Sequence, residues 1–421
     1  MRRQGGPWAV VGALLVSILP GVAEAVSEVD VLLNKLIEKG ILTQADASEI
    51  RSEVQHTKEA RNAELAKELV PESARNWTWS GDLLLREEYR NRTGTGQDVN
   101  RQRIRFRYGF DAKVAEGLNV GARLTTGTST DPGSPNQTFN TSFNHKNFFL
   151  DRAYVQYSPE VPSIDEARLT GGMFANPFWT VGQLMWDEDL SFDGAAVHLA
   201  KTLGPVTVFT NAGVFLLQSD ITEAASLWSA QGGASWKPFA DAAEEAAKHL
   251  KFTGALAYHD YKNVTNPFSE STALTTAGGL RGNSDGLQDL NLLNSTVEVV
   301  SQRAQIPFGV FGDWVHNTPS ASSNHGFQIG VKAGQARVPF DLRKGWEGGY
   351  YFERLPPDAT FGAFTDSDFG NGGTNHTGHV YWLKLAVLKN SAVQLKFYDT
   401  QELKGAKNHA ETFRTDWITK F

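Results

Sequence analysis

The sequence predicts an all-β protein, a transmembrane antiparallel β-barrel of about sixteen strands preceded by a short α-helical segment. Three observations support this fold class. Polar and apolar side chains alternate at every second residue along many short segments, which is the period of a β-strand with two different faces. The connections between these segments are alternately short and long, as at the two rims of an outer-membrane barrel. The first 25 residues indicate that the chain is exported.

The N-terminus has the three parts of a signal peptide. Arg2 and Arg3 precede an apolar run from Trp8 to Leu19, and the small-residue cleavage motif "AEA" ends at Ala25. The apolar run has about 12 residues, fewer than the roughly 20 that a membrane-spanning helix needs. We therefore predict a signal peptide over residues 1–25, cleavage after Ala25, and an exported protein whose membrane residence is that of a barrel.

Residues 26–75 follow a helical pattern and are expected to form a periplasmic leader. Apolar residues over 29–37 recur at helical spacing, Gly40 stands at a C-terminal cap position, and Thr43 with Asp46 resembles a capping box. This stripe is too short to be buried on its own, so we expect it to associate as in a coiled coil, to contact the rest of the protein, or to bind a periplasmic partner. The alternative is a partly disordered leader.

Residues 76–421 carry the strand alternation and form the predicted barrel. Tryptophans lie near the ends of the predicted strands, where interfacial girdles belong, whereas a soluble exported β-sandwich would bury most of them mid-strand. The long connection over 238–249 exceeds the length of a tight turn and suggests a small helix. The sixteen predicted strands cover residues 77–89, 102–115, 118–127, 148–158, 166–175, 191–200, 205–217, 227–237, 249–262, 292–304, 307–316, 325–334, 343–354, 379–388, 391–399 and 412–421.

Composition excludes several classes of function. The net charge of -7 and the absence of a basic stripe argue against nucleic acid as a partner. The chain has no cysteine, so disulfides, thiolate metal sites and a cysteine nucleophile are excluded. Asp366 and Asp368 lack EF-hand spacing and are typical of an extracellular turn, the histidines are scattered, and no nucleophile elbow is present. We predict no enzyme activity, no metal site and no cofactor.

One segment, "RQRIRFRYGF", combines two contrasting faces. Arg101, Arg103, Arg105 and Arg107 occupy every second position, and from Arg103 onward the positions between carry Ile104, Phe106, Tyr108 and Phe110. In a membrane barrel the apolar row faces lipid and the arginine row faces the lumen. On the same basis the residues expected on the lipid face are Ile104, Phe106, Val120, Leu124, Ile329 and Leu395.

Several longer motifs carry a family resemblance. The phrases "LLNKLIEKGILTQ", "GGMFANPFW", "FGDWVHN" and "FTDSDFGNGGTNHTGH" resemble the putative porins of Gram-negative bacteria, with the phosphate-selective porins as near relatives. The resemblance covers nearly all of the chain after the signal peptide. It implies an outer-membrane diffusion channel for small hydrophilic solutes, surrounded by outer-membrane lipid and lipopolysaccharide. It also implies a homotrimer, as in general porins, and recognition of the terminal Phe421 by the barrel assembly machinery.

The resemblance also suggests which residues form the pore. Arg103, Arg105 and Arg107 would line the lumen beside Arg123 and Arg152. In general porins the loop between the fifth and sixth strands folds inward, and here residues 177–190 would bring Asp187, Glu188 and Asp189 against the arginines as a constriction. The alternative is that the arginines only pair with Asp82, Glu88 and Asp111 and stabilise the wall.

Three classes of function remain after these observations. The favoured function is passive diffusion with mild anion selectivity, because charge at a constriction matters more than net charge. A substrate-specific porin of the phosphate or anion type is the nearest alternative. An outer-membrane barrel enzyme and a soluble exported β-protein are the other two classes.

Overall fold

The structure is a computed structural model of the 421-residue chain. The chain divides into two compact units, Met1–Arg75 and Asn76–Phe421. The predicted signal peptide and most of the predicted helix after Gln55 lie outside the described residues, so both stay predictions. The structure describes residues 28–54, 57, 76–93, 98–128, 131–140, 142–218, 224–264, 283 and 290–421.

The described part of the first unit is a pair of helices. Helix α2 (Glu28–Glu38) is followed by Gly40, whose φ of 70° lies in the left-handed region that favours glycine. A second helix covers residues 44–54. At its start the Asp46 carboxylate accepts a hydrogen bond from the Thr43 amide at 2.9 Å, and the Thr43 hydroxyl accepts one from the Asp46 amide at 3.2 Å. Both predicted caps are therefore confirmed.

The apolar stripe of this unit is buried only in part. Leu33 is 4% exposed and Ala47 is fully buried, whereas Leu32 is 60% exposed. None of the helices that the structure describes is long and apolar enough to cross a membrane.

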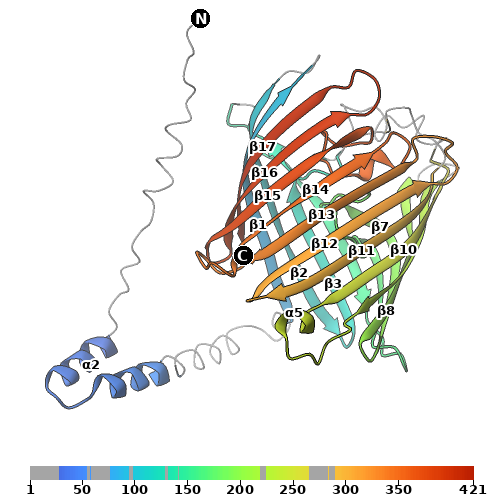
Figure 1. Ribbon diagram of the computed structural model, residues 1–421. Helices are drawn as coiled ribbons and strands as arrows, with labels where there is room; N and C mark the ends of the chain where they lie inside the picture. Colours follow the sequence, from blue (N-terminus) through green and yellow to red (C-terminus); the bar gives the residue numbers. More distant parts are fainter. Residues whose placement is uncertain are drawn as a thin grey trace, which may run out of the picture. The chain divides into compact units, whose positions relative to one another are not determined.

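The second unit is a closed antiparallel barrel with sixteen strands in its wall, which confirms the predicted fold class (Figure 1). Each of the sixteen predicted segments corresponds to one wall strand. The wall strands are β1 (Trp77–Arg92), β2 (Val99–Ala115), β3 (Leu118–Thr126), β5 (Phe148–Tyr157), β6 (Glu166–Ala175), β7 (Ser191–Leu203), β8 (Val206–Gln218), β9 (Ala225–Trp236), β10 (Lys251–Lys262), β11 (Asn291–Arg303), β12 (Ile306–Asn317), β13 (His325–Ala336), β14 (Gly345–Leu355), β15 (His376–Leu388), β16 (Ser391–Glu402) and β17 (His409–Lys420).

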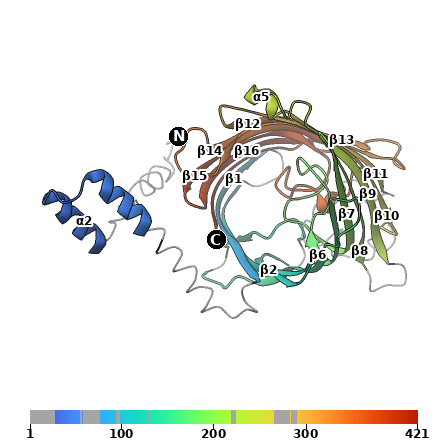
Figure 2. The ribbon, with the colours of Figure 1, turned by 90° about the horizontal axis from the view of Figure 1, so that it is seen from below.

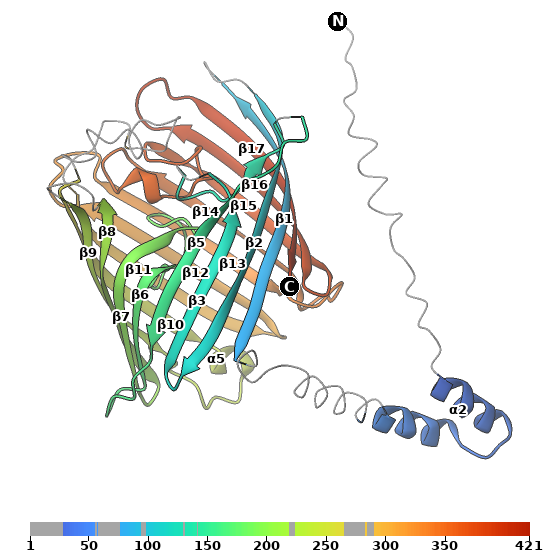
Figure 3. The same cartoon turned by 180° about the vertical axis from the view of Figure 1, so that it is seen from behind.

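The barrel closes where the first strand pairs with the last. The β1–β17 pairing runs antiparallel (Figure 3). All the remaining pairings within the wall join strands that follow one another along the chain. The two-residue strand β4 (Gln137–Thr138) lies in the connection from β3 to β5 and pairs with β2. Helix α5 (Glu245–Lys248) confirms the small helix predicted between β9 and β10, and η1 (Gly362–Phe364) lies between β14 and β15.

The two faces of the wall alternate as the sequence predicts. On β2, Arg103 and Arg105 are 8% and 7% exposed, whereas Tyr108 is 40% exposed. Leu124 and Ile329, both expected on the lipid face, are 47% and 58% exposed. A period of two therefore separates an inner charged face from an outer apolar face.

The C-terminus completes an aromatic cluster at the rim of short turns. The Phe421 amide donates to the Gly81 carbonyl at 3.1 Å, and the Gly81 amide donates to the Phe421 carbonyl at 2.8 Å. The Phe421 ring lies over Gly81, where a Cβ atom would collide with it. Trp79 contacts Tyr108 with ring centroids 5.4 Å apart, and Tyr108 contacts Phe421 at 6.3 Å. These exposed rings match the girdle expected at a membrane interface.

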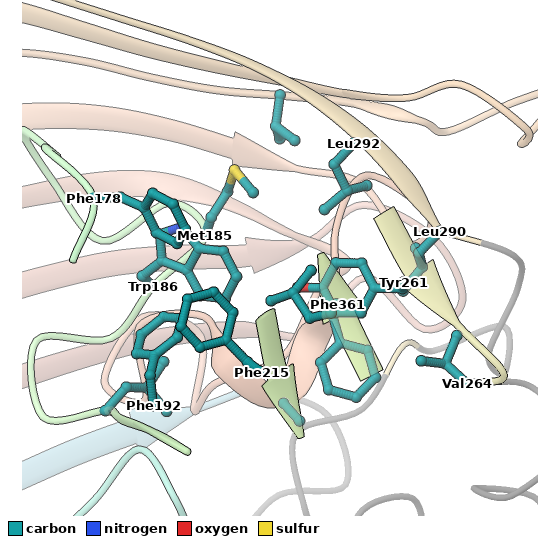
Figure 4. Packing of buried hydrophobic residues seen from close by; sticks show 14 of the residues in the cluster. Phe178, Met185, Trp186, Phe192, Phe215, Tyr261, Val264, Leu290, Leu292 and Phe361 are labelled. Carbon is teal, nitrogen blue, oxygen red and sulfur yellow. The ribbon is translucent and has the colours of Figure 1, made fainter. Parts of the chain in front are cut away.

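Two long connections lie inside the ring of strands, residues 176–190 and residues 356–375 (Figure 2). Their apolar side chains meet those of the inner wall in one buried cluster, which we call the lumen core (Figure 4). Phe178 and Trp186 come from the first connection, Phe361 comes from the second, and Phe215 is one of the wall residues. The inward arginine row predicts a polar lumen, but part of the interior is apolar because these connections cover it.

Candidate functional site

The arginine row of β2 faces the interior of the barrel. The β1–β2 register sets Arg101 opposite Glu88, Arg103 opposite Arg86, and Arg107 opposite Asp82. Arg101 forms an ion pair with Glu88 at 2.8 Å. Two of the three carboxylates named as structural partners, Asp82 and Glu88, thus do pair with this row.

The middle of the row also pairs with the connection over 176–190. Asp82 contacts Arg105 at 3.0 Å and Arg107 at 2.6 Å. Asp189 contacts the same two guanidiniums, at 3.2 Å and 2.7 Å. These four side chains, which we call the first ion-pair cluster, carry two positive and two negative charges. Arg105 and Arg107 therefore contact both a carboxylate of the wall and a carboxylate of the connection.

Arg103 lies beside this cluster but has different partners. Its Nη2 donates to the Ser134 hydroxyl at 3.2 Å and to the Asn136 carbonyl at 2.9 Å. Its buried Nε has no hydrogen-bond partner. Within the described part of the chain, Arg103 forms no ion pair.

The predicted pore residues on β3 and β5 lie side by side. Arg123 is opposite Arg152 in the register and forms an ion pair with Asp151. Arg152 donates one long hydrogen bond, of 3.4 Å, from Nε to the Ser191 hydroxyl. No carboxylate among the described residues forms an ion pair with Arg152.

The connection over 176–190 reaches several parts of the inner wall. The Trp179 amide donates to the Gln231 side chain on β9 at 2.8 Å, and Gln231 returns a bond to the Trp179 carbonyl at 3.0 Å. Gly182 lies so close to Gln328 of β13 that a Cβ atom would collide with the Gln328 amide. Together with Asp189 on the β2 side, these contacts carry the connection across the interior.

The other two predicted loop carboxylates do not contact the arginine row. The Asp187 carboxylate accepts the Ser367 amide at 2.7 Å, and the Asp187 amide donates to the Phe364 carbonyl at 2.7 Å. Asp187 thus joins the two inner connections to each other. Glu188 is exposed, and it forms no ion pair within the described residues.

The junction between the two connections places buried carboxyl groups near one another. Burial, followed by the charges of Asp189 and Asp366, raises the pKa of Asp187 well above its usual value. Burial, followed by the charge of Asp368, raises the pKa of Asp366. Asp187 and Asp366 therefore hold a proton more readily where the connections meet than a free aspartate does.

A second ion-pair cluster holds the connection over 356–375, and the sequence reasoning missed it. Asp368 pairs with Arg86 at 3.1 Å and with Arg414 of β17. Arg86 also pairs with Asp416 at 2.7 Å, and Arg414 pairs with Glu88 at 3.0 Å. Although burial acts in the opposite direction, the guanidiniums of Arg414 and Arg86 hold the pKa of Asp368 well below its usual value.

The sequence pattern predicts an extracellular turn at Asp366 and Asp368, whereas the structure places Asp368 against Arg86 and Arg414 of the inner wall. Arg86 and Arg90 on β1 and Arg414 on β17 are buried positive charges that call for a carboxylate partner, but the alternation alone does not identify that partner. Among the residues that the structure describes, no three His, Asp or Glu side chains are placed to hold a metal ion.

A closed antiparallel barrel with a charged inner wall and two inward connections is the architecture of a channel-forming barrel of the outer membrane. The family model described as "Putative porin" matches residues 86–290 and 294–421. The chain belongs to this putative porin family, and it is an outer-membrane porin. A search of curated proteins finds no significant sequence match.

Solved porin structures resemble the barrel at low sequence identity. OprB of Pseudomonas putida superposes with a TM-score of 0.54 at 9% identity, covering 82% of this chain and 94% of that one. OmpF of Salmonella typhi gives a TM-score of 0.49 at 9% identity, covering 82% and 97%. A porin of Rhodopseudomonas blastica gives 0.41 at 11% identity, covering 82% and 100%. The likeness to OprB supports the barrel fold alone, since the sequences have diverged so far.

Proposed function

We propose that this porin is a passive diffusion channel for small hydrophilic solutes with a mild preference for anions. Family and fold point to a channel rather than an enzyme. The observation behind the proposed anion preference is that two inward arginines, Arg103 and Arg152, have no carboxylate partner among the described residues. Both lie on the inner face, Arg103 on β2 beside Arg105 and Arg107 and Arg152 on β5, and neither forms an ion pair within the described residues.

The charges along this part of the wall explain why the preference is for anions. The first ion-pair cluster is neutral overall, since Arg105 and Arg107 are matched by Asp82 and Asp189. Alternate positions on one strand are about 6–7 Å apart. This spacing is shorter than the Debye length of about 8 Å at physiological salt, so the field of Arg103 adds to those of its neighbours. An anion that passes this wall therefore encounters net positive charge, despite the net charge of -7 of the chain.

The test is the reversal potential of the purified protein in a planar bilayer under a KCl gradient. We expect wild type to favour chloride, and the triple change of Arg103, Arg105 and Arg107 to Ser to shift selectivity toward potassium. The matched control replaces Arg337, Arg343 and Lys344 with Ser in the short turn between β13 and β14. It removes three positive charges outside the arginine row. Equal selectivity in wild type and the arginine-row variant would refute the proposal.

We further propose the partners that the family resemblance implies. Outer-membrane lipid and lipopolysaccharide would surround the apolar outer face, and three copies of the chain would associate. The terminal Phe421 would be the recognition signal for barrel assembly. Replacing Phe421 with Ser should reduce the amount of heat-modifiable barrel in outer membranes, and an unchanged amount would contradict this role.

A further inference from the structure

The inner face of β5, β6 and β7 forms a pocket of about 260 Å³ beside the start of the connection over 176–190. The neighbouring residues on the outer face, Val155 and Leu169, are each 48% exposed, so the intervening pocket residues point to the lumen. The side chains with polar groups that line the pocket are those of Arg152, Tyr154, Gln156, Arg168, Thr170, Asn176 and His198.

The charge balance of this pocket is incomplete. Arg152 is half-buried, and among the residues that the structure describes it makes one hydrogen bond, of 3.4 Å, to Ser191. Arg168 reaches Glu166 at 3.9 Å, but the Glu166 side chain is 63% exposed and contributes little at that distance. A guanidinium removed from water without an anionic partner is unfavourable, and its planar set of donors matches a carboxylate or a phosphate. The pocket therefore offers a binding position for an anion.

The rest of the lining distinguishes between types of anion. Phe174, Pro177 and Ala196 add apolar groups to the lining of the pocket. Inorganic phosphate has no apolar part to contact these residues, whereas a small organic acid has one. A ligand with a carboxylate head and a short hydrocarbon body would match both the charged and the apolar groups of the pocket.

His198 connects the pocket to the inward connection. Its Nδ1 lies 2.6 Å from the Asn211 side-chain oxygen, and the Asn211 amide donates to Gln231 at 2.8 Å. Gln231 in turn holds the backbone of Trp179. This chain of hydrogen bonds fixes the His198 ring and the start of the connection together, so the pocket is built on ordered side chains.

We propose that this pocket binds small organic carboxylates, with Arg152 as the main contact for the carboxylate group. The inference rests on the proposed channel and names the class of solute that the channel holds. Arg168 adds positive charge at the pocket, and Phe174 contacts the hydrocarbon part of the solute.

Binding is tested directly by titration calorimetry on the full chain folded in detergent micelles, with butyrate and inorganic phosphate as probes. We expect butyrate to bind at least tenfold more tightly than phosphate. Arg152→Gln should weaken butyrate binding by about tenfold to a hundredfold, because a charge-assisted hydrogen bond is lost. Lys384→Gln on β15 removes a positive charge from the inner face across the barrel and should leave butyrate binding unchanged.

The outcomes separate this inference from the proposed function. Equal or tighter binding of phosphate would overturn the assignment to organic carboxylates, and unchanged butyrate binding in Arg152→Gln would overturn the site. Arg152→Lys should restore part of the affinity, which a merely structural arginine would not do. A barrel that conducts KCl but binds no butyrate would overturn the inference and leave the channel intact. Butyrate binding by a barrel without conductance would refute only the channel.

Discussion

Replacing Asp189 with Asn should release the connection over 176–190 from the arginine row. Asp189 contacts Arg105 and Arg107, and its carboxylate is 8% exposed. The change leaves two guanidiniums with only Asp82, so the first ion-pair cluster goes from neutral to a net charge of +1. Removing one partner of a buried ion pair costs about 3–5 kcal/mol. The remaining carboxylate still compensates one charge, so we expect the lower end, about 3 kcal/mol.

Hydrogen exchange measured by mass spectrometry reports this cost locally. If the connection detaches without unfolding the wall, a loss of about 3 kcal/mol corresponds to roughly 150-fold faster exchange of its protected amides. The amide of Asp187 is one such group, since it donates to the Phe364 carbonyl at 2.7 Å. Wall strands should exchange as in wild type, because their ladders do not depend on Asp189.

Glu188→Gln is the matched control. It removes the same charge one residue earlier, but Glu188 is exposed and forms no ion pair within the described residues. In Glu188→Gln the amides of the connection over 176–190 should exchange at rates within about threefold of wild type, as expected for a surface change of under 0.5 kcal/mol. If Asp189→Asn and Glu188→Gln give the same exchange, the ion pairs of Asp189 do not hold the connection and the reasoning is refuted.

Three further predictions concern other parts of the molecule. Leu395→Arg should destabilise the barrel to urea by about 2–4 kcal/mol if the site lies near mid-membrane, whereas Gln394→Arg on the inner face should be tolerated; equal costs contradict the alternation. Deleting residues 26–70 should lower the melting temperature of the proposed trimer without abolishing conductance, and an unchanged melting temperature counts against that role. Because the pKa values of Asp187 and Asp366 are raised in the folded state, their contribution to stability is complete below the unfolded pKa and is lost as pH rises through the folded pKa. Lowering the pH from 8 should therefore slow the exchange of amides around Asp187 and Asp366, after correction for the intrinsic pH dependence of exchange. The double variant Asp187→Asn and Asp366→Asn should lack this pH dependence.

The wall of the barrel could be predicted because it is governed by local rules. A strand with lipid on one side and a polar interior on the other needs a period of two, and "RQRIRFRYGF" shows that period without ambiguity. Short turns such as the one at Ala304 and Gln305 could be recognised from their length alone. The inward direction of Arg103, Arg105 and Arg107 follows from the same alternation, with no knowledge of their partners.

The partners across the lumen could not be predicted in this way. Asp189 and Asp368 occupy connections, where no periodicity restricts the direction of a side chain. Asp189 was expected near the arginines through the family resemblance, but nothing in the sequence distinguished it from Asp187 two residues earlier. The distinction depends on which carboxylate reaches Arg107 and which meets Ser367, and that is decided by packing between segments far apart in the chain.

The sequence does carry a signal for the lumen core. In "GVFLL", residues 213–217, apolar side chains follow one another, so both faces of β8 are apolar there. Lipid can cover only the outer face, and an apolar inner face in a barrel requires other protein atoms to cover it. Phe215 is 1% exposed because Phe178 and Phe192 contact its ring.

This placement of the lumen core has a consequence for the path of solutes. On the core side the connection over 176–190 is held by apolar contacts such as Phe178 with Phe215, which no solute ion can replace. On the opposite side it is held by Asp189 bound to Arg105 and Arg107, and a carboxylate or chloride ion can compete for those donors. We therefore expect the passage for solutes to widen along the arginine row rather than through the lumen core. This would link the proposed anion preference to the weaker of the two attachments of the connection over 176–190.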